Sequence, residues 1–342
     1  DIDFKNLFTT WFNRGFLVLR PINWGSPAHI LEKIISYESV HAIDSWDDLR
    51  RRLQPDDRRC FAFFHPAMPD EPLIFVEVAL THGTPNSVQN ILSEHRDPQA
   101  AVDADTATFY SISNCQTGLA GISFGNSLIK TVVEYLLRDL PQIKYFVTLS
   151  PIPGLVKWLR ENNKFEQATD AQALLPLAAH YLLEAKHRTG QPLDPVARFH
   201  LNNGAFVEAV HADADISANG MAQSCGVMVN YRYDLNKIST NHEAYANQQS
   251  VVASKAVWAL ADQGQERAAR RVRAERPRGG PGAARELHGL RRERARVPHA
   301  RGGEQLGAGL GPVHGRALRR AGRDAPARRL LLRPPRGERH VP

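Results

Sequence analysis

The stretch ATFYSISNCQTGLAGISFGNSLIKTVVEYLLRDL, residues 107–140, carries the strongest indication of the fold. Its first seven residues are rich in aromatic and β-branched side chains and predict a strand. A glycine-containing loop follows, and residues 124–140 then place apolar side chains at helical spacing until Pro141 ends the helix. Residues 145–149 predict the next strand. This order of strand, loop, helix and strand in a mixed sheet indicates an α/β (α+β) fold.

A β-hairpin is predicted on the N-terminal side of this unit. Residues 59–65 (RCFAFFH) and 73–80 (LIFVEVAL) form two strand-like runs on either side of a turn that contains proline and aspartate. On the C-terminal side we expect helices at residues 155–161, 171–186 and 242–262, and strands at residues 196–200, 205–211 and 227–233.

The composition changes abruptly after Gln265. Residues 266–342 contain 21 Arg, no Lys and seven acidic residues, a net charge of +14, so the whole-chain charge of +7 leaves the preceding residues at −7. The tail has no aromatic residue and no periodic apolar pattern, so it cannot bury enough surface to offset its ordering entropy. We therefore predict a folded body, residues 1–265, and an unstructured Arg/Gly/Pro-rich tail, residues 266–342.

Two interpretations of this basic tail are open. It can be an arm that binds nucleic acid, although it lacks the aromatic side chains on which bases stack. A shifted reading frame through GC-rich DNA produces the same composition, and we favour that interpretation, so nucleic acid is not an expected partner. The chain also begins with Asp1 and not with Met, which predicts that an N-terminal piece is missing.

The body has the features of a protein from a reducing, cytoplasm-like compartment. Its apolar runs are too short or too interrupted to span a bilayer, and no signal peptide opens the sequence, so export is not indicated. The three cysteines, Cys60, Cys115 and Cys225, are far apart and form no zinc-binding spacing. We predict neither a disulfide framework nor a metal site.

The loop QTGLAGIS, residues 116–123, is a candidate anion site. It lies between a strand and a helix, where glycines admit a ligand close to the backbone and where the first helical N–H groups attract phosphate. The pattern matches neither of the common nucleotide-binding loops, so an ordinary turn is the competing interpretation.

Further along the chain, a hydroxyl side chain precedes a segment that forces strands apart. Thr148 lies in the strand YFVTLS, and the segment SPIPG that follows Leu149 has two prolines and a glycine, which part a strand from its neighbour and open a cleft. Simple β-propensity at Thr148 and a turn that begins at Ser150 are the alternative.

Two histidines and two tyrosines are also candidates. His200 comes at the end of an apolar stretch, before the turn signal NNG, where an imidazole can act as a proton donor or serve a structural role. His65 precedes Pro66, which favours a role in a turn. Tyr231 and Tyr233 share one face of a predicted strand, for which core packing is the default.

Taken together, several segments resemble the malonyl-CoA decarboxylase family. They occur in the family's order and span residues 1–262 almost completely. The matching segments are INWGSPAHILEKII (22–35), FFHPAMPDEPLIFVEVALT (63–81), FYSISNCQTGLAGISFGNSLIK (109–130), TLSPIPGLVKWL (148–159), PVARFHLNNGA (195–205) and SCGVMVNYRY (224–233).

The resemblance implies the fold of GCN5-related acetyltransferases, in which two central strands splay and coenzyme A enters the gap. It also implies that a hydroxyl on the splayed strand and a histidine form the catalytic pair, which fall on Thr148 and His200, with Tyr233 nearby. Family members often have Ser at the position of Thr148, and the alignment can slip to Ser150. The residues implied to bind coenzyme A are Gln116, Thr117, Gly118, Leu119, Ala120, Gly121, Ile122 and Ser123.

The activity implied for residues 1–265 is the decarboxylation of malonyl-CoA to acetyl-CoA and CO2 with no cofactor. Family members begin with a helical domain that they use for oligomerisation, and this domain is absent from the sequence. We would expect a homo-oligomer when the domain is present. An acyltransferase of the same fold, and a nucleic-acid-binding protein acting through the basic tail, are the alternatives.

Overall fold

The computed structural model describes residues 17–98, 100–116, 128–168 and 170–274, which all belong to one compact unit, Asp1–Pro277. Of the unstructured tail predicted for residues 266–342, residues 275–342 lie outside the described residues. The helices and strands are β1 (Val18–Ile22), α2 (Ala28–Tyr37), α3 (Trp46–Leu53), β2 (Arg58–His65), β3 (Met68–Thr81), α4 (Val88–Leu92), β4 (Thr106–Asn114), α5 (Leu128–Asp139), β5 (Tyr145–Thr148), β6 (Ser150–Pro151), α6 (Leu155–Glu161), α7 (Ala171–Glu184), α8 (Pro195–Asn202), β7 (Phe206–His211), α9 (Ala218–Ser224), β8 (Met228–Arg232), α10 (Ile238–Gln248) and α11 (Lys255–Ala274).

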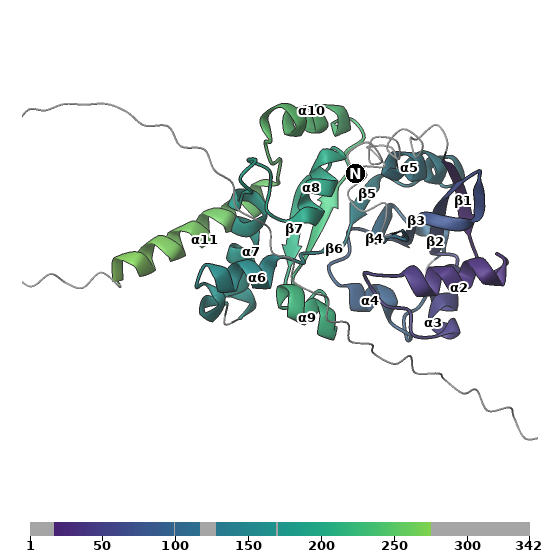
Figure 1. Cartoon of the computed structure of the whole chain (residues 1–342), viewed down its shortest axis with the longest axis horizontal. Helices are drawn as coiled ribbons and strands as arrows, with labels where there is room; N and C mark the ends of the chain where they lie inside the picture. The colour runs from purple at the N-terminus through teal and green to yellow at the C-terminus, as the bar shows by residue number, and fades with distance from the viewer. Residues whose placement is uncertain (1–16, 99, 117–127, 169, 275–342) are drawn as a thin grey trace, which may run out of the picture. The chain divides into compact units, whose positions relative to one another are not determined.

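The strands form one mixed sheet in the order β1-β2-β3-β4-β5-β8-β6, with β7 also paired to β8. Only β4 and β5 run parallel, and the other pairs among the described strands are antiparallel. Helix α5 covers one face of β2 to β4, where its apolar side packs against Phe61, Val76 and Phe109. Helices α2 and α3 cover the opposite face (Figure 1). The predicted α/β class is therefore confirmed.

The two central strands part at the position that the prolines predict. Strand β5 pairs with β4 from Thr106↔Tyr145 to Phe109↔Thr148, and Leu149 N–H donates one more hydrogen bond to Phe109 O, at 3.0 Å. Beyond this point, β6 pairs within the described residues only with β8. Pro151 has no N–H for a ladder, so the end of β4 and strand β6 are left unpaired to each other.

A second irregularity lies opposite this gap. In the pairing of β3 with β4, Glu77 faces Ser111 and Val78 faces Phe109, so Tyr110 is an extra residue in β4. Such a β-bulge bends the strand that carries it. The bulge therefore adds to the divergence of β4 from its neighbour.

The strand predicted at residues 196–200 is wrong, because this segment belongs to helix α8. Asp194 caps the helix by accepting hydrogen bonds from the N–H groups of Val196 (3.0 Å) and Ala197 (2.9 Å), and Pro195 occupies the first helical position. His200 consequently lies in the last turn of a helix and not at a strand end.

The single helix predicted at residues 242–262 is also wrong. Helix α10 ends at Gln248, because the next residue, Gln249, has a left-handed φ of 53°, and the chain then extends so that Ala253 forms a bridge with Val207. Helix α11 begins after Ser254, whose hydroxyl accepts from Val257 N–H at 3.2 Å. It continues to Ala274, past the composition change at Gln265, where no helical period was expected.

Candidate active site

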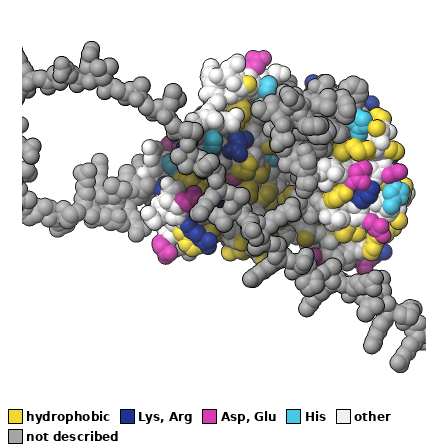
Figure 2. Space-filling view, in the orientation of Figure 1, with side chains coloured by type: hydrophobic (Ala, Val, Ile, Leu, Met, Phe, Trp, Pro, Cys, Tyr) yellow, Lys and Arg dark blue, Asp and Glu magenta, His cyan; other side chains and the backbone are white. Residues whose placement is uncertain are grey.

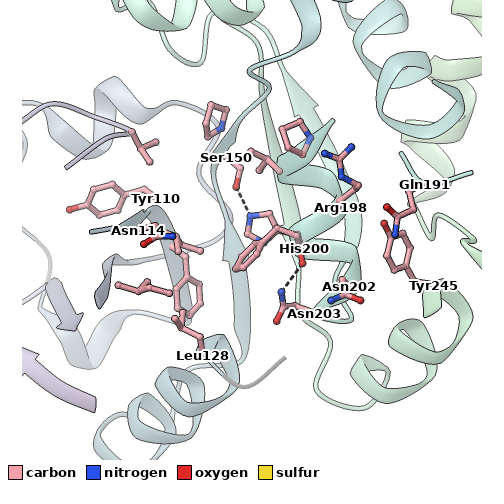
Figure 3. Close-up of a pocket in the computed structure, with 18 residues that line it drawn as sticks. Tyr110, Asn114, Leu128, Ser150, Gln191, Arg198, His200, Asn202, Asn203 and Tyr245 are labelled. Carbon is pink, nitrogen blue, oxygen red and sulfur yellow. Dashed lines mark hydrogen bonds between the residues drawn. The ribbon is translucent and has the colours of Figure 1, made fainter. Parts of the chain in front are cut away.

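A cavity of about 670 Å³ opens in the gap between β4 and the segment that follows β5. Its walls come from three main sources, the end of β4, strand β6 and helix α8 (Figure 3). The described lining residues are Val40, Ile74, Phe109, Tyr110, Ile112, Asn114, Leu128, Ser150, Pro151, Gln191, Pro195, Val196, Arg198, Phe199, His200, Asn202, Asn203 and Tyr245.

Within this cavity, His200 is hydrogen bonded through both ring nitrogens. Nε2 lies 3.2 Å from Ser150 Oγ, and Nδ1 lies 2.8 Å from Tyr233 Oη. The ring of Tyr231 stacks on the imidazole, with 4.5 Å between the centroids. Figure 3 shows the Ser150 hydroxyl pointing at the imidazole. The side chains of β6, α8 and β8 therefore meet at one buried imidazole.

Thr148 lies next to this group but outside the cavity wall formed by the described residues. It is fully buried, and its Oγ1 accepts hydrogen bonds from Ser150 Oγ at 2.8 Å and from Tyr231 N–H at 3.1 Å. The structure thus places Ser150, and not Thr148, against His200. Sequence alternation could not separate the two hydroxyls, because residues two apart in a strand share a face.

Burial determines the protonation state of His200, whose side chain is 2% exposed. Removal from water penalises the charged imidazolium and lowers the pKa of His200 to about 3. The imidazole is therefore neutral at physiological pH. Burial also raises the pKa of Tyr233 well above its ordinary value, so this phenol keeps its proton.

The low pKa of His200 leads to a prediction about stability. An unfolded histidine binds a proton near pH 6.5, whereas folded His200 does so only near pH 3. Between these two pH values protonation favours the unfolded state, so the free energy of unfolding decreases as the pH falls from about 6.5 toward about 3. Between about pH 7.5 and about pH 5.5, the free energy of unfolding should fall by about 1.4 kcal/mol more in the wild type than in His200→Gln. Urea titrations of both proteins at the two pH values measure this difference. An equal loss in both would contradict a neutral, buried His200.

One wall of the cavity depends on a buried polar network behind Val40. Glu38 accepts hydrogen bonds from the backbone N–H groups of Val40 (2.7 Å) and His41 (2.8 Å) and from Ser111 Oγ of β4 (2.9 Å). The guanidinium of Arg52 donates to His41 O at 2.8 Å. The hydrogen bond from Ser111 connects the loop after α2 to β4, which also contributes to the cavity wall.

Arg198 was not identified from the sequence, although it belongs to the segment PVARFHLNNGA. It is the only Lys or Arg among the described lining residues, and its Nη1 donates to the carbonyls of Pro192 and Leu193, both at 2.9 Å. No carboxylate lies within ion-pair distance of it in the described part of the chain. Arg198 does interact electrostatically with the buried Asp194, since burial raises the pKa of this carboxyl and the charge of Arg198 opposes the rise. A cation that lines a cavity without a direct ion pair suits an anionic ligand.

Of the other sequence candidates, Gln116 lies at the end of β4 and its amide donates to Glu71 Oε1 at 2.9 Å. The candidates Thr117, Gly118, Leu119, Ala120, Gly121, Ile122 and Ser123 lie outside the described residues. His65 does not line the cavity; it is the last residue of β2, and its Nδ1 accepts from Ala67 N–H in the following turn at 3.1 Å. This agrees with the turn role that Pro66 indicates.

The cysteines and the surface add no second candidate site in the part of the chain that the structure describes. Cys60, Cys115 and Cys225 are free thiols, and the first two are buried. Acidic, basic and hydrophobic side chains are interspersed on the visible described surface over β1 and α2 (Figure 2). Among the helices of the described residues, none has the length and apolar character needed to cross a membrane.

Comparison with known proteins identifies malonyl-CoA decarboxylases as relatives of this chain. The family model described as the malonyl-CoA decarboxylase C-terminal domain matches residues 15–172 and 162–271. Mitochondrial malonyl-CoA decarboxylase of the goose Anser anser anser is 39% identical over 309 residues, which cover 77% of this chain and 61% of the goose protein. The mouse protein of the same name is 36% identical over 306 residues, which cover 76% of this chain and 62% of the mouse protein. The chain thus spans about three fifths of the length of these relatives.

Solved structures give the same result. The crystal structure of malonyl-CoA decarboxylase from Rhodopseudomonas palustris is 53% identical with a TM-score of 0.71, over 75% of this chain and 69% of that chain. The crystal structure of malonyl-CoA decarboxylase from Agrobacterium vitis is 52% identical with a TM-score of 0.72, over 76% of this chain and 70% of that chain.

Proposed function

Because this chain belongs to the malonyl-CoA decarboxylase family, we propose that it converts malonyl-CoA to acetyl-CoA and CO2 in the cavity between β4 and β6. The observation that carries this proposal is the hydrogen-bonded series of Ser150, His200 and Tyr233, of which Ser150 and His200 line the cavity. The catalytic hydroxyl in this proposal is that of Ser150 and not that of Thr148, because Ser150 lines the cavity and contacts the imidazole.

The reaction requires that negative charge on the thioester be stabilised. When CO2 leaves, the electron pair of the broken C–C bond moves into the thioester, whose oxygen becomes an enolate oxygen. In our proposal Ser150 Oγ–H donates a hydrogen bond to that oxygen. One donor that is fixed in place before the reaction contributes roughly 3 kcal/mol to such a transition state.

His200 then supplies the proton that completes acetyl-CoA. The α carbon of the enolate takes the proton from Nε2, and solvent restores this proton after the product leaves. The hydrogen bond that Tyr233 Oη–H donates to Nδ1 stabilises the ring while it lacks the Nε2 proton. A positioned proton donor of this kind contributes about 10²-fold or more to the rate.

The composition of the cavity favours departure of CO2. Much of its wall is apolar, from Phe109, Ile112 and Leu128. An apolar wall solvates a carboxylate poorly and neutral CO2 well, so it favours the product side of the bond-breaking step. We propose that Arg198 contributes to binding an anionic part of malonyl-CoA. No metal or organic cofactor is proposed, because the thioester itself accepts the electron pair.

The test is incubation of the purified full chain with malonyl-CoA, without any amine acceptor and with a chelator present. We expect CO2 and acetyl-CoA in equal amounts. An acyltransferase of similar fold would release no CO2 and would consume the thioester only when an amine is added. A chain that binds malonyl-CoA and follows the second pattern would refute the proposal.

A further inference from the structure

Thr148 is buried directly behind the Ser150 hydroxyl, and it is one of the few polar side chains of the described core that contacts the site without lining it. We infer that Thr148 is a positioning residue that determines which nitrogen of His200 carries the proton, and that its catalytic effect rests on the proposed function above. Four groups form this hydrogen-bonded series, and the donation from Ser150 Oγ to Thr148 Oγ1 determines the direction of the other bonds.

The Ser150 hydroxyl has one proton, and the geometry directs it to Thr148. Ser150 Oγ donates to Thr148 Oγ1 at 2.8 Å. The same oxygen of Thr148 accepts from Tyr231 N–H at 3.1 Å, and the carbonyl of Thr148 accepts from Asn230 Nδ2 at 2.7 Å. Two bonds from β8 therefore hold Thr148 in place as an acceptor for Ser150.

Because the Ser150 hydroxyl donates its one hydrogen bond to Thr148 Oγ1, Ser150 Oγ can only accept a hydrogen bond from His200. Its partner Nε2, at 3.2 Å, must then carry a proton. A neutral imidazole has one N–H, so Nδ1 has a lone pair and accepts from Tyr233 Oη–H at 2.8 Å. All hydrogen bonds of the series run in one direction, from Tyr233 through His200 and Ser150 to Thr148.

This direction places the His200 proton where the reaction needs it. Nε2 belongs to the side of the ring that faces Ser150 and the cavity, and so it can deliver its proton to the α carbon. Without an acceptor at residue 148, Ser150 would donate to Nε2 instead. The imidazole proton would then move to Nδ1 and bond to Tyr233, and Nε2 would have no proton to deliver.

When the enolate oxygen forms, it is a stronger acceptor than the threonine hydroxyl. The Ser150 proton can then turn from Thr148 to that oxygen by rotation about the Cβ–Oγ bond. Thr148 thus accepts the Ser150 hydrogen bond until the enolate oxygen forms and replaces it as the acceptor. Because the Thr148 side chain is not part of the described cavity wall, its loss should lower kcat and leave KM nearly unchanged.

The experiment compares the wild-type full chain with Thr148→Val and Thr148→Ser. Valine keeps the shape of threonine but accepts no hydrogen bond, and serine keeps the acceptor. The 15N shifts of the His200 ring, assigned by their disappearance in His200→Gln, report which nitrogen is protonated. We expect an Nε2–H ring in the wild type and in Thr148→Ser, and an Nδ1–H ring in Thr148→Val with kcat lower by about 10²-fold or more.

An Nδ1–H ring in the wild type would overturn the inference, and this measurement requires no variant to fold. An Nε2–H ring that persists in a folded Thr148→Val would also overturn it. The result for the His200 tautomer can be distinguished from the result for the proposed decarboxylase activity. A wild type with the Nε2–H ring but no release of CO2 would contradict only the decarboxylase proposal, whereas active protein with an Nδ1–H ring would contradict only the role of Thr148.

Discussion

His200→Gln is expected to reduce kcat for CO2 release from malonyl-CoA by about 10²- to 10⁴-fold, the range that a general acid contributes. The glutamine amide can form hydrogen bonds with Ser150 and Tyr233 in place of the ring, but it cannot deliver a proton to carbon. Affinity for acetyl-CoA should change by less than about threefold, since the cavity wall keeps its size. Steady-state kinetics and calorimetric titration with acetyl-CoA measure the two effects.

His187→Gln is the matched control for this variant. His187 is an exposed residue whose ring contacts Thr189, and it is not among the described residues that line the cavity. Its replacement should leave turnover unchanged. If His200→Gln turned over malonyl-CoA at the rate of this control, the imidazole would not be the proton donor.

Ser150→Ala should reduce kcat by about 10²- to 10³-fold, because it removes a hydrogen-bond donor to the enolate oxygen. The fold should tolerate the change, since Thr148 Oγ1 still accepts from Tyr231 N–H. Ser250→Ala, at an exposed serine beyond α10, is the control. Kinetics of both variants, with circular dichroism to confirm folding, make the comparison.

The double variant Ser150→Ala/His200→Gln tests whether the two side chains act as a unit. Ser150 and His200 are hydrogen bonded to each other, and the effects of residues that act as a unit are not additive, so the double variant should be little worse than His200→Gln alone. Multiplication of the two single effects would indicate that Ser150 and His200 act independently, against the proposed mechanism.

Much of the fold could be predicted from the sequence. The hairpin of β2 and β3, strand β4, helix α5 and the parting of the strands after Leu149 follow from local patterns, namely β-branched runs, helical spacing and the prolines of SPIPG. Helix α8 was missed because its buried residues Ala197, His200 and Leu201 span only one turn, so the apolar stretch resembles a strand. The Asp194-Pro195 pair was the available signal for a helix start.

The site could be predicted less completely. The sequence and its family resemblance identified His200 and Tyr233, which the structure brings within hydrogen-bonding distance of each other. They could not decide between Thr148 and Ser150, because strand alternation places both on one face. Which hydroxyl contacts His200 depends on the direction of β6 after β5 and on the position of α8, which carries the imidazole. Both are tertiary features that local sequence patterns do not determine. Arg198 was missed for the same reason, since its position in the cavity depends on the helix.

The most direct measurement is a crystal structure of the full chain with bound acetyl-CoA, the proposed product. We expect the thioester oxygen within about 3.2 Å of Ser150 Oγ and the methyl carbon facing Nε2 of His200, both in the gap between β4 and β6. An acetyl group bound elsewhere, with Ser150 and His200 out of reach of the thioester, would contradict the proposed site and its chemistry.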